Sequence, residues 1–254
     1  QGFFLLAIIV SVVFLLSQLL VLKYVMERKE LPKSKITFTD EIKTLIKIDQ
    51  LLVIDVVIIL FQLVTYITSG MAFFYFKYDL GNEDLMVYFG AVGGVAMFMA
   101  AFVFPVLSKF FNRRRIFQIS VILPIIGFVG LVINSFILNN SFAGLISFGI
   151  PVFLGIGFSM VIQTLLLSDS VEYGEWKTHK RTEGLIFSVQ TFMVKFSYAI
   201  SSGLIGIGLT IIKFKDNEIQ TSYTLIGMRV MMFVIPVMGL LIALIIYNKY
   251  FNLN

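Results

Sequence analysis

The sequence contains no cysteine and only one histidine, His179, among its 254 residues. A chain without cysteine forms no disulfide framework and no cysteine-based metal site, and a single histidine excludes a histidine-rich metal site. Charged residues are also scarce, at 14%, whereas typical soluble chains carry about 25%. The sequence shows no nucleophile–base pair and no cluster of metal-ligating residues. These absences argue against an enzyme, and no resident cofactor is expected.

Apolar residues make up 58% of the chain, and phenylalanine alone accounts for 27 residues. Apolar runs of about 20 residues, long enough to cross a bilayer as helices, recur along the whole length. The predicted fold class is therefore an all-α, polytopic membrane protein with seven transmembrane helices in a lipid bilayer. We expect these helices at residues 3–25, 51–76, 85–108, 116–138, 142–168, 184–212 and 225–248.

Lysine and arginine are distributed unequally between the two ends of these predicted helices. One side carries fifteen of them, and the other carries three, Lys77, Lys213 and Lys215. Basic connections are typical of the cytoplasmic side. The first span should therefore begin outside, and the C-terminus should lie in the cytoplasm of a cell that is expected to be bacterial. These basic connections account for the net charge of +5, and no nucleic-acid partner is expected.

Lys195 lies near the middle of the sixth predicted span, where a cation costs at least about 2.5–3.5 kcal/mol. At about 100° per residue, it belongs to one small or polar stripe of the helix. The stripe comprises Gly184, Ser188, Thr191, Lys195, Tyr198 and Ser202, with Gln190 to one side. Such a stripe can be a helix–helix contact, but an ionisable residue inside a span usually marks a pathway or coupling site. We therefore predict that Lys195 faces a polar cavity.

The second predicted span holds further polar residues. Asp55 lies about one turn into this span and is either a boundary residue at the cytoplasmic interface or a pathway residue. Gln62, Thr65 and Tyr66 lie further along the span and are candidate cavity groups. Polar residues are also common at helix contacts, so both interpretations of these three residues stay open.

Between the fifth and sixth predicted spans, charges of both signs crowd the segment SDSVEYGEWKTHKRTEG. Its acids are Asp169, Glu172, Glu175 and Glu183, and its bases are Lys177, Lys180 and Arg181. By composition alone this segment is a solvated loop, whose ion pairs are worth about 0–1 kcal/mol each. If the preceding helix continues, Asp169 and Glu172 share a face.

The stretch DSVEYGEWKTHKRTEGLIFSVQTFMVK resembles the helix ten to helix eleven region of the glycoside–pentoside–hexuronide:cation symporters. Acidic, aromatic, glycine and basic positions all coincide, first as D-x-V-E-Y-G-E-W-K-T, then as K-R-x-E-G, then at the downstream lysine. A looser likeness covers the rest of the chain and includes FFYFKYDLG after the second span. This family belongs to the major facilitator superfamily and includes the melibiose and lactose permeases.

The resemblance implies transport of a sugar or glycoside by alternating access, driven by Na⁺, H⁺ or Li⁺. By position, Lys195 resembles the family's helix-eleven lysine at the sugar and cation site. Its sugar-facing neighbours would be Gln190, Thr191 and Val194. The group linked to conformational coupling would be Asp169, Glu172, Glu175, Arg181 and Glu183. Met160 stands where the melibiose permease has a sugar-stacking tryptophan, which argues against an identical sugar pose.

Seven spans running from outside to inside fit helices 6–12 of a transporter built from two six-helix halves. Residues 1–25 would then be the last helix of the N-terminal half, 26–50 the central cytoplasmic loop and 51–254 the C-terminal half. The chain begins at Gln1 inside a span, as expected of a fragment. In the family the main cation-binding acids lie on the N-terminal half. We therefore expect that missing half as a partner, and no transport by this chain alone.

Two alternatives share this layout. A related carrier for lysolipids or another amphipathic solute would also have phenylalanine-rich spans. A retinal-binding receptor would have seven helices and a buried lysine, but on its seventh span, whereas Lys195 is on the sixth. The identity of the sugar, and the choice between Na⁺ and H⁺, stay open.

Overall fold

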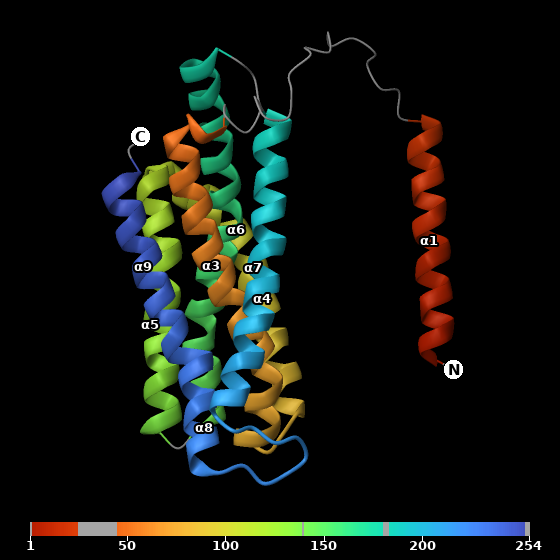
Figure 1. Ribbon diagram of the computed structural model, residues 1–254, viewed down its shortest axis with the longest axis vertical. Helices are drawn as coiled ribbons and strands as arrows, with labels where there is room; N and C mark the ends of the chain where they lie inside the picture. Colours follow the sequence, from red (N-terminus) through yellow and green to blue (C-terminus); the bar gives the residue numbers. More distant parts are fainter. Residues whose placement is uncertain (1, 25–44, 139, 180–182, 252–254) are drawn as a thin grey trace. The chain divides into compact units, whose positions relative to one another are not determined.

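The computed structural model describes residues 2–24, 45–138, 140–179 and 183–251 (Figure 1). Every regular element in these ranges is helical. Seven helices are long and apolar enough to cross a membrane, which confirms the predicted all-α fold class. The chain forms two compact units, residues 1–38 and residues 39–254.

The described part of the first unit is α1, Gly2–Tyr24. Its sequence is apolar on every side, and the side chains of residues 4–23 are exposed. A helix without a polar face is typical of a membrane span. The division of the chain into residues 1–25, 26–50 and 51–254 stays a prediction.

The second unit is a bundle of six spans. They follow the sequence as α3 (Asp49–Phe74), α4 (Asp84–Phe110), α5 (Arg113–Phe136), α6 (Phe142–Thr178), α7 (Glu183–Ile211) and a last span made of α8 (Ser222–Arg229), η2 (Val230–Val234) and α9 (Ile235–Tyr250). A π-helical segment, η1 (Tyr75–Asp79), continues α3. α6 packs against α4 and α5, and α3 packs against α7 and α9 (Figure 1).

Local sequence signals explain where several of these helices begin and end. The hydroxyl of Ser141 accepts a hydrogen bond from the Gly144 amide at the start of α6, and Thr221 caps α8 in the same way. Gly81 has a φ of 67°, a conformation that glycine adopts without steric strain. The span formed by α3 and η1 therefore ends at a turn around this glycine.

α6 is ten residues longer than the predicted span. It continues past Ser168 to Thr178 and ends at His179, whose left-handed φ of 53° closes the helix. With 37 residues it is about 55 Å long, whereas a bilayer core is about 30 Å thick. Figure 1 shows this end of α6 reaching beyond the neighbouring helices. The prediction of a loop after residue 168 is wrong, because polarity marks the edge of the membrane and this segment contains no proline to end the helix.

Small residues bring α5 and α6 into close contact. A Cβ atom added at Gly130 would lie 2.1 Å from Cδ1 of Phe148. One added at Gly155 would lie 2.2 Å from Cδ of Pro124. Neither distance leaves room for a methyl group, so these glycines allow the close approach that is common between membrane helices.

An ion pair ties the last span to the end of η1. Arg229 donates from Nε and Nη2 to the two carboxylate oxygens of Asp79, both at 2.7 Å, and from Nη1 to the carbonyl of Ser135 at 2.6 Å. The side chain of Asp79 is 1% exposed. Tyr75, also on η1, donates to Oδ1 of Asn140 at 2.9 Å. These contacts join three spans at one end of the bundle.

Candidate functional site

The polar stripe predicted around Lys195 lies on an open face of α7. Its members are all exposed: Gly184, Ser188, Thr191, Lys195, Tyr198 and Ser202. The hydroxyls of Ser188 and Thr191 donate to backbone carbonyls one turn earlier, at 2.7 Å and 2.9 Å. Each hydroxyl therefore uses its hydrogen within the helix, and its oxygen can still accept a hydrogen bond from a ligand.

Lys195 has no such local partner. Within the ranges that the structure describes, its ammonium makes neither a hydrogen bond nor an ion pair. Gln190 and Val194, which precede it on α7, are half-buried. Because an ammonium carries a full charge and three donors, Lys195 requires water, a ligand or an acidic partner beyond these ranges.

The structure brings two of the predicted cavity residues into contact. Tyr66 of α3 and Tyr198 of α7 meet edge to face, with 5.2 Å between ring centroids and 86° between ring planes. Tyr198 follows Lys195 by about one helical turn, so the aromatic pair borders the lysine. Gln62 lies one turn before Tyr66 on α3 and is half-buried. Aromatic side chains beside amide and ammonium donors suit a ligand that carries both apolar surface and hydroxyl groups.

Asp55 lies in the interior of the bundle. The residue is 4% exposed, and its Oδ1 atom has no hydrogen-bond partner among the described residues. Helix geometry places it on the same face of α3 as Gln62 and Tyr66. Burial of an unpaired polar group is costly, so the position of Asp55 is more typical of a functional group than of a solvated boundary residue.

One predicted coupling residue, Asp169, and the nearby Lys177 are paired on the projecting end of α6. Asp169 forms an ion pair with Arg113 at the start of α5. Lys177 forms one with Asp49 at the start of α3, and the Tyr173 hydroxyl also donates to Asp49, at 3.0 Å. These contacts hold the projecting end of α6 against two other helices of the second unit.

Other members of the predicted coupling group are presented to solvent. Glu172 and Glu175 are exposed on α6 and make no ion pair within the described part of the chain. Glu183 is exposed at the start of α7, and Arg181 lies outside the described residues. Lys195 is about 18 Å further along α7 than Glu183. The structure therefore places the lysine and the charged group at two different depths.

Sequence reasoning missed the partners in these ion pairs. It gave no role to Asp49, Arg113, Asp79 or Arg229. A signal for one pair is nevertheless present, because an arginine inside a span needs an acid or carbonyl groups at a similar depth. Asp79 is the acid that ends the α3–η1 span.

The whole chain, residues 1–254, matches the family model described as MFS/sugar transport protein. The chain is 33% identical over 230 residues to Uncharacterized symporter YjmB of Bacillus subtilis (strain 168), which is 89% of this chain and 48% of that protein. It is 30% identical over 210 residues to the lactose permease of Leuconostoc lactis, covering 81% of this chain and 32% of that protein. The lactose permease of Lactobacillus helveticus is 27% identical over 212 residues, with the same two coverages.

The chain spans about half the length of these relatives, or less. They are symporters and permeases, which confirms the predictions of a transport protein and of no enzyme. The family match also sets aside the retinal-receptor alternative, and it agrees with the resemblance carried by the charged segment. Since the match extends over all of its residues, the chain belongs to the MFS/sugar transport protein family.

Proposed function

We propose that the full-length protein is a secondary active transporter that carries a sugar or glycoside together with a cation, Na⁺ or H⁺, by alternating access. The observation that carries this proposal is the open polar face of α7, on which Lys195 lies beside the contact of Tyr66 and Tyr198. The names of two relatives, both lactose permeases, support a sugar as the substrate. The membrane is a bacterial cell membrane, with the C-terminus in the cytoplasm.

In this proposal two groups of residues on α7 and α3 form the transport site. The substrate-binding and coupling residues are Lys195, Gln190, Thr191 and Val194. The residues that line the cavity are Asp55, Gln62, Tyr66 and Tyr198. Sites for substrate and coupling ion lie near the middle of the bilayer in such transporters, and Lys195 lies near the middle of α7.

The other half of the full-length protein completes the site and supplies the main cation-binding carboxylates. Lys195 faces these carboxylates across the cavity. A cation that neutralises them weakens their attraction for Lys195, and sugar hydroxyls bound at Gln190 and Thr191 respond to the change. This is a reciprocal coupling free energy between sugar and cation, typically about 1–3 kcal/mol.

The substitution Lys195→Ala in the full-length protein tests this mechanism. We expect some downhill sugar flux to persist while uphill accumulation against a gradient is lost, because the sugar site no longer senses the cation. The effect of the cation on sugar affinity, about 5–150-fold for a typical coupling, should shrink towards none. The measurement is uptake of labelled lactose into membrane vesicles, with and without an imposed Na⁺ or H⁺ gradient.

A matched control is Lys109→Ala, which removes an exposed lysine from the end of α4 and should leave accumulation unchanged. Full cation-driven accumulation by Lys195→Ala would contradict the role of Lys195. Uptake of lysolipid without uptake of any sugar would instead favour the carrier of amphipathic solutes.

A further inference from the structure

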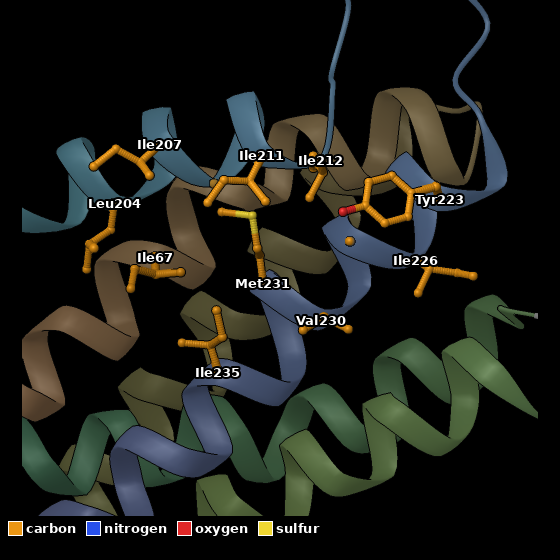
Figure 2. Close-up of a pocket in the computed structure, with 12 residues that line it drawn as sticks. Ile67, Leu204, Ile207, Ile211, Ile212, Tyr223, Ile226, Val230, Met231 and Ile235 are labelled. Carbon is orange, nitrogen blue, oxygen red and sulfur yellow. The ribbon is translucent and has the colours of Figure 1, made fainter.

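An apolar cleft of about 540 Å³ lies between the end of α7 and the beginning of the last span (Figure 2). Its floor is formed by the buried side chains of Ile67, Ile212 and Met231, which come from three different spans. The volume lies within the range of ligand pockets, roughly 300–1,000 Å³. The cleft is therefore large enough to hold part of a small molecule.

The rims of the cleft are exposed. Leu204, Ile207 and Ile211 form the α7 rim and are 45%, 61% and 62% exposed. Tyr223 and Ile226 of α8 form much of the opposite rim and are also exposed (Figure 2). The cleft thus opens sideways from the bundle and follows α7 for about 12 Å, from Leu204 to Ile212.

The cleft flanks a close crossing of α7 and the last span. A Cβ atom added at Gly208 would lie 2.1 Å from Cε of Met231, and one added at Gly227 would lie 2.4 Å from Cγ2 of Ile212. Because both glycines lack side chains, Met231 and Ile212 occupy the crossing itself. The space beside the crossing stays open.

The cleft lies on the side of α7 away from the polar stripe. At about 100° per residue, Leu204, Ile207 and Ile211 are rotated from Lys195 by about 180°, 120° and 160°. The polar stripe is the face that the proposed function assigns to the sugar path and the other half of the transporter. The cleft therefore opens on a different side of α7 from the face assigned to both.

Both helices that form the rims are membrane spans by length and composition. An apolar cavity does not hold ordered water, and an empty one forfeits dispersion contacts along its walls. The molecule available to fill an apolar cleft that opens sideways in a membrane is a lipid. An extended acyl chain matches a narrow aliphatic cleft that follows a helix.

The residue that follows the α7 side of the cleft in the sequence is a cation. Lys213 directly follows Ile212, is exposed, and makes no ion pair within the described ranges. The two acids of the same connection are engaged, since Glu218 pairs with Lys215 at 3.2 Å and Asp216 accepts from the Tyr78 hydroxyl. Lys213 is thus the cation of this connection that is available to an anionic group.

We propose that the cleft binds one acyl chain of a phospholipid from the adjacent leaflet, and that Lys213 and the hydroxyl of Tyr223 hold its phosphate. Figure 2 shows the Tyr223 hydroxyl turned towards the α7 side of the cleft. Tyrosine and lysine near the ends of spans are typical anchors at the membrane interface. The site depends on neither Lys195 nor the coupling cation.

The test uses the full-length protein in vesicles that contain phosphatidylglycerol with a photoreactive acyl chain. After illumination, mass spectrometry measures the labelling of each peptide. We expect labelling of residues 204–212 and 223–235 to exceed that of the exposed α5 face around Ile126 several-fold. The substitution Ile207→Trp, which fills the cleft, should lower this labelling several-fold, whereas Ile126→Trp should not. Lys213→Gln should lower labelling by phosphatidylglycerol more than labelling by a neutral photoreactive glycolipid that lacks phosphate.

Labelling of the cleft no greater than that of the α5 face would overturn the site. So would a helix of the other half seated in the cleft, detected by cross-linking from a cysteine introduced at Ile207. Equal labelling by the two lipids, unchanged by Lys213→Gln, would overturn the phosphate contact. None of these outcomes depends on sugar uptake, so they are distinguishable from failure of the proposed function.

Discussion

Arg229 and Lys195 are both cations inside spans, and they differ in whether a partner lies within the second unit. Arg229 donates two hydrogen bonds to the carboxylate of Asp79 and a third to the carbonyl of Ser135. Lys195 has no partner within the described ranges. Charged residues inside a membrane are stable only when they are paired or face a polar space. Arg229 is therefore a structural residue of the second unit, whereas Lys195 is available for a ligand or for a partner outside the described residues.

The substitution Arg229→Gln tests the structural role of this residue. It leaves the buried Asp79 carboxylate without its charged partner, and loss of one member of a buried pair costs about 3–5 kcal/mol. We expect a clear fall in the thermal unfolding midpoint of the full-length protein, measured in detergent. The double substitution Asp79→Asn with Arg229→Gln should recover part of the loss, because no uncompensated charge remains.

Arg115→Gln is the matched control for this experiment, because Arg115 is an exposed arginine at the start of α5. It should leave the unfolding midpoint nearly unchanged. An equal fall for Arg229→Gln and Arg115→Gln would show that the Asp79 pair has no special structural role.

Among the elements, α6 combines a membrane span with a charged end that projects from it. The ion pairs of Asp169 with Arg113 and of Lys177 with Asp49 attach this end to α5 and α3. In the proposed alternating-access mechanism, this end should therefore move together with the second unit. Glu172 and Glu175 are exposed on the same end. We propose that these two acids and Arg181 belong to a latch that contacts the other half in one conformation.

Two variants test this latch, Arg181→Gln and the double substitution Glu172→Gln with Glu175→Gln. Each should slow transport more than it weakens sugar binding, because latch contacts form and break during the rocking of the halves. Exposed ion pairs are worth about 0–1 kcal/mol each, so we expect up to about fivefold in rate per pair. The measurements are the equilibrium dissociation constant for the sugar and the rate of sugar exchange.

Glu83→Gln serves as the control, since Glu83 is an exposed acid at the other end of the bundle. It should change neither binding nor rate. Wild-type binding together with wild-type exchange in both latch variants would argue against a latch on α6.

In the second unit, the helix ends that adjoin the basic connections contact one another at one end of the bundle. The start of α3 meets the end of α6 through Asp49 and Lys177, and the start of α5 meets the end of α9 through Gln118 and Asn248 at 2.7 Å. At the other end, η1 meets the connection after α7 through Tyr78. The end with many lysines and arginines is the one that we propose to lie in the cytoplasm.

The orientation of the full-length protein in the membrane can be tested by labelling from one side. Because this chain contains no cysteine, single cysteines can be introduced once any cysteines of the other half are replaced by serine. A membrane-impermeant maleimide should label Ile219→Cys on intact cells, because Ile219 is 99% exposed at the lysine-poor end. It should label Asn112→Cys, exposed at the lysine-rich end, only after permeabilisation.

The cysteine-free parent protein is the control and should show no labelling. Labelling of Asn112→Cys, and not of Ile219→Cys, on intact cells would mean that the C-terminus lies outside. That result would reverse the orientation while leaving the bundle itself unchanged.

The sequence by itself determined the number and position of the spans, the polar stripe of α7 and the all-α membrane fold class. These are local properties, because a helix satisfies its own backbone hydrogen bonds and a bilayer requires about 20 apolar residues in a row. The periodicity of one helix is equally sufficient to place Lys195, Thr191 and Tyr198 on one face. Hydropathy located the membrane boundary near residue 168 but not the end of α6, because a helix continues into water wherever its residues permit it.

Only the tertiary structure decided which of these residues meet. Arg229 and Asp79 are separated by 150 residues, and the ring of Tyr66 meets that of Tyr198 on another span. The crossing beside the apolar cleft likewise requires Gly208 to meet Met231 and Gly227 to meet Ile212. The rotation of one span against its neighbour follows from packing between helices and not from the hydropathy of either helix. For that physical reason sequence patterns predicted the spans but could not predict the charge pairs or the cleft.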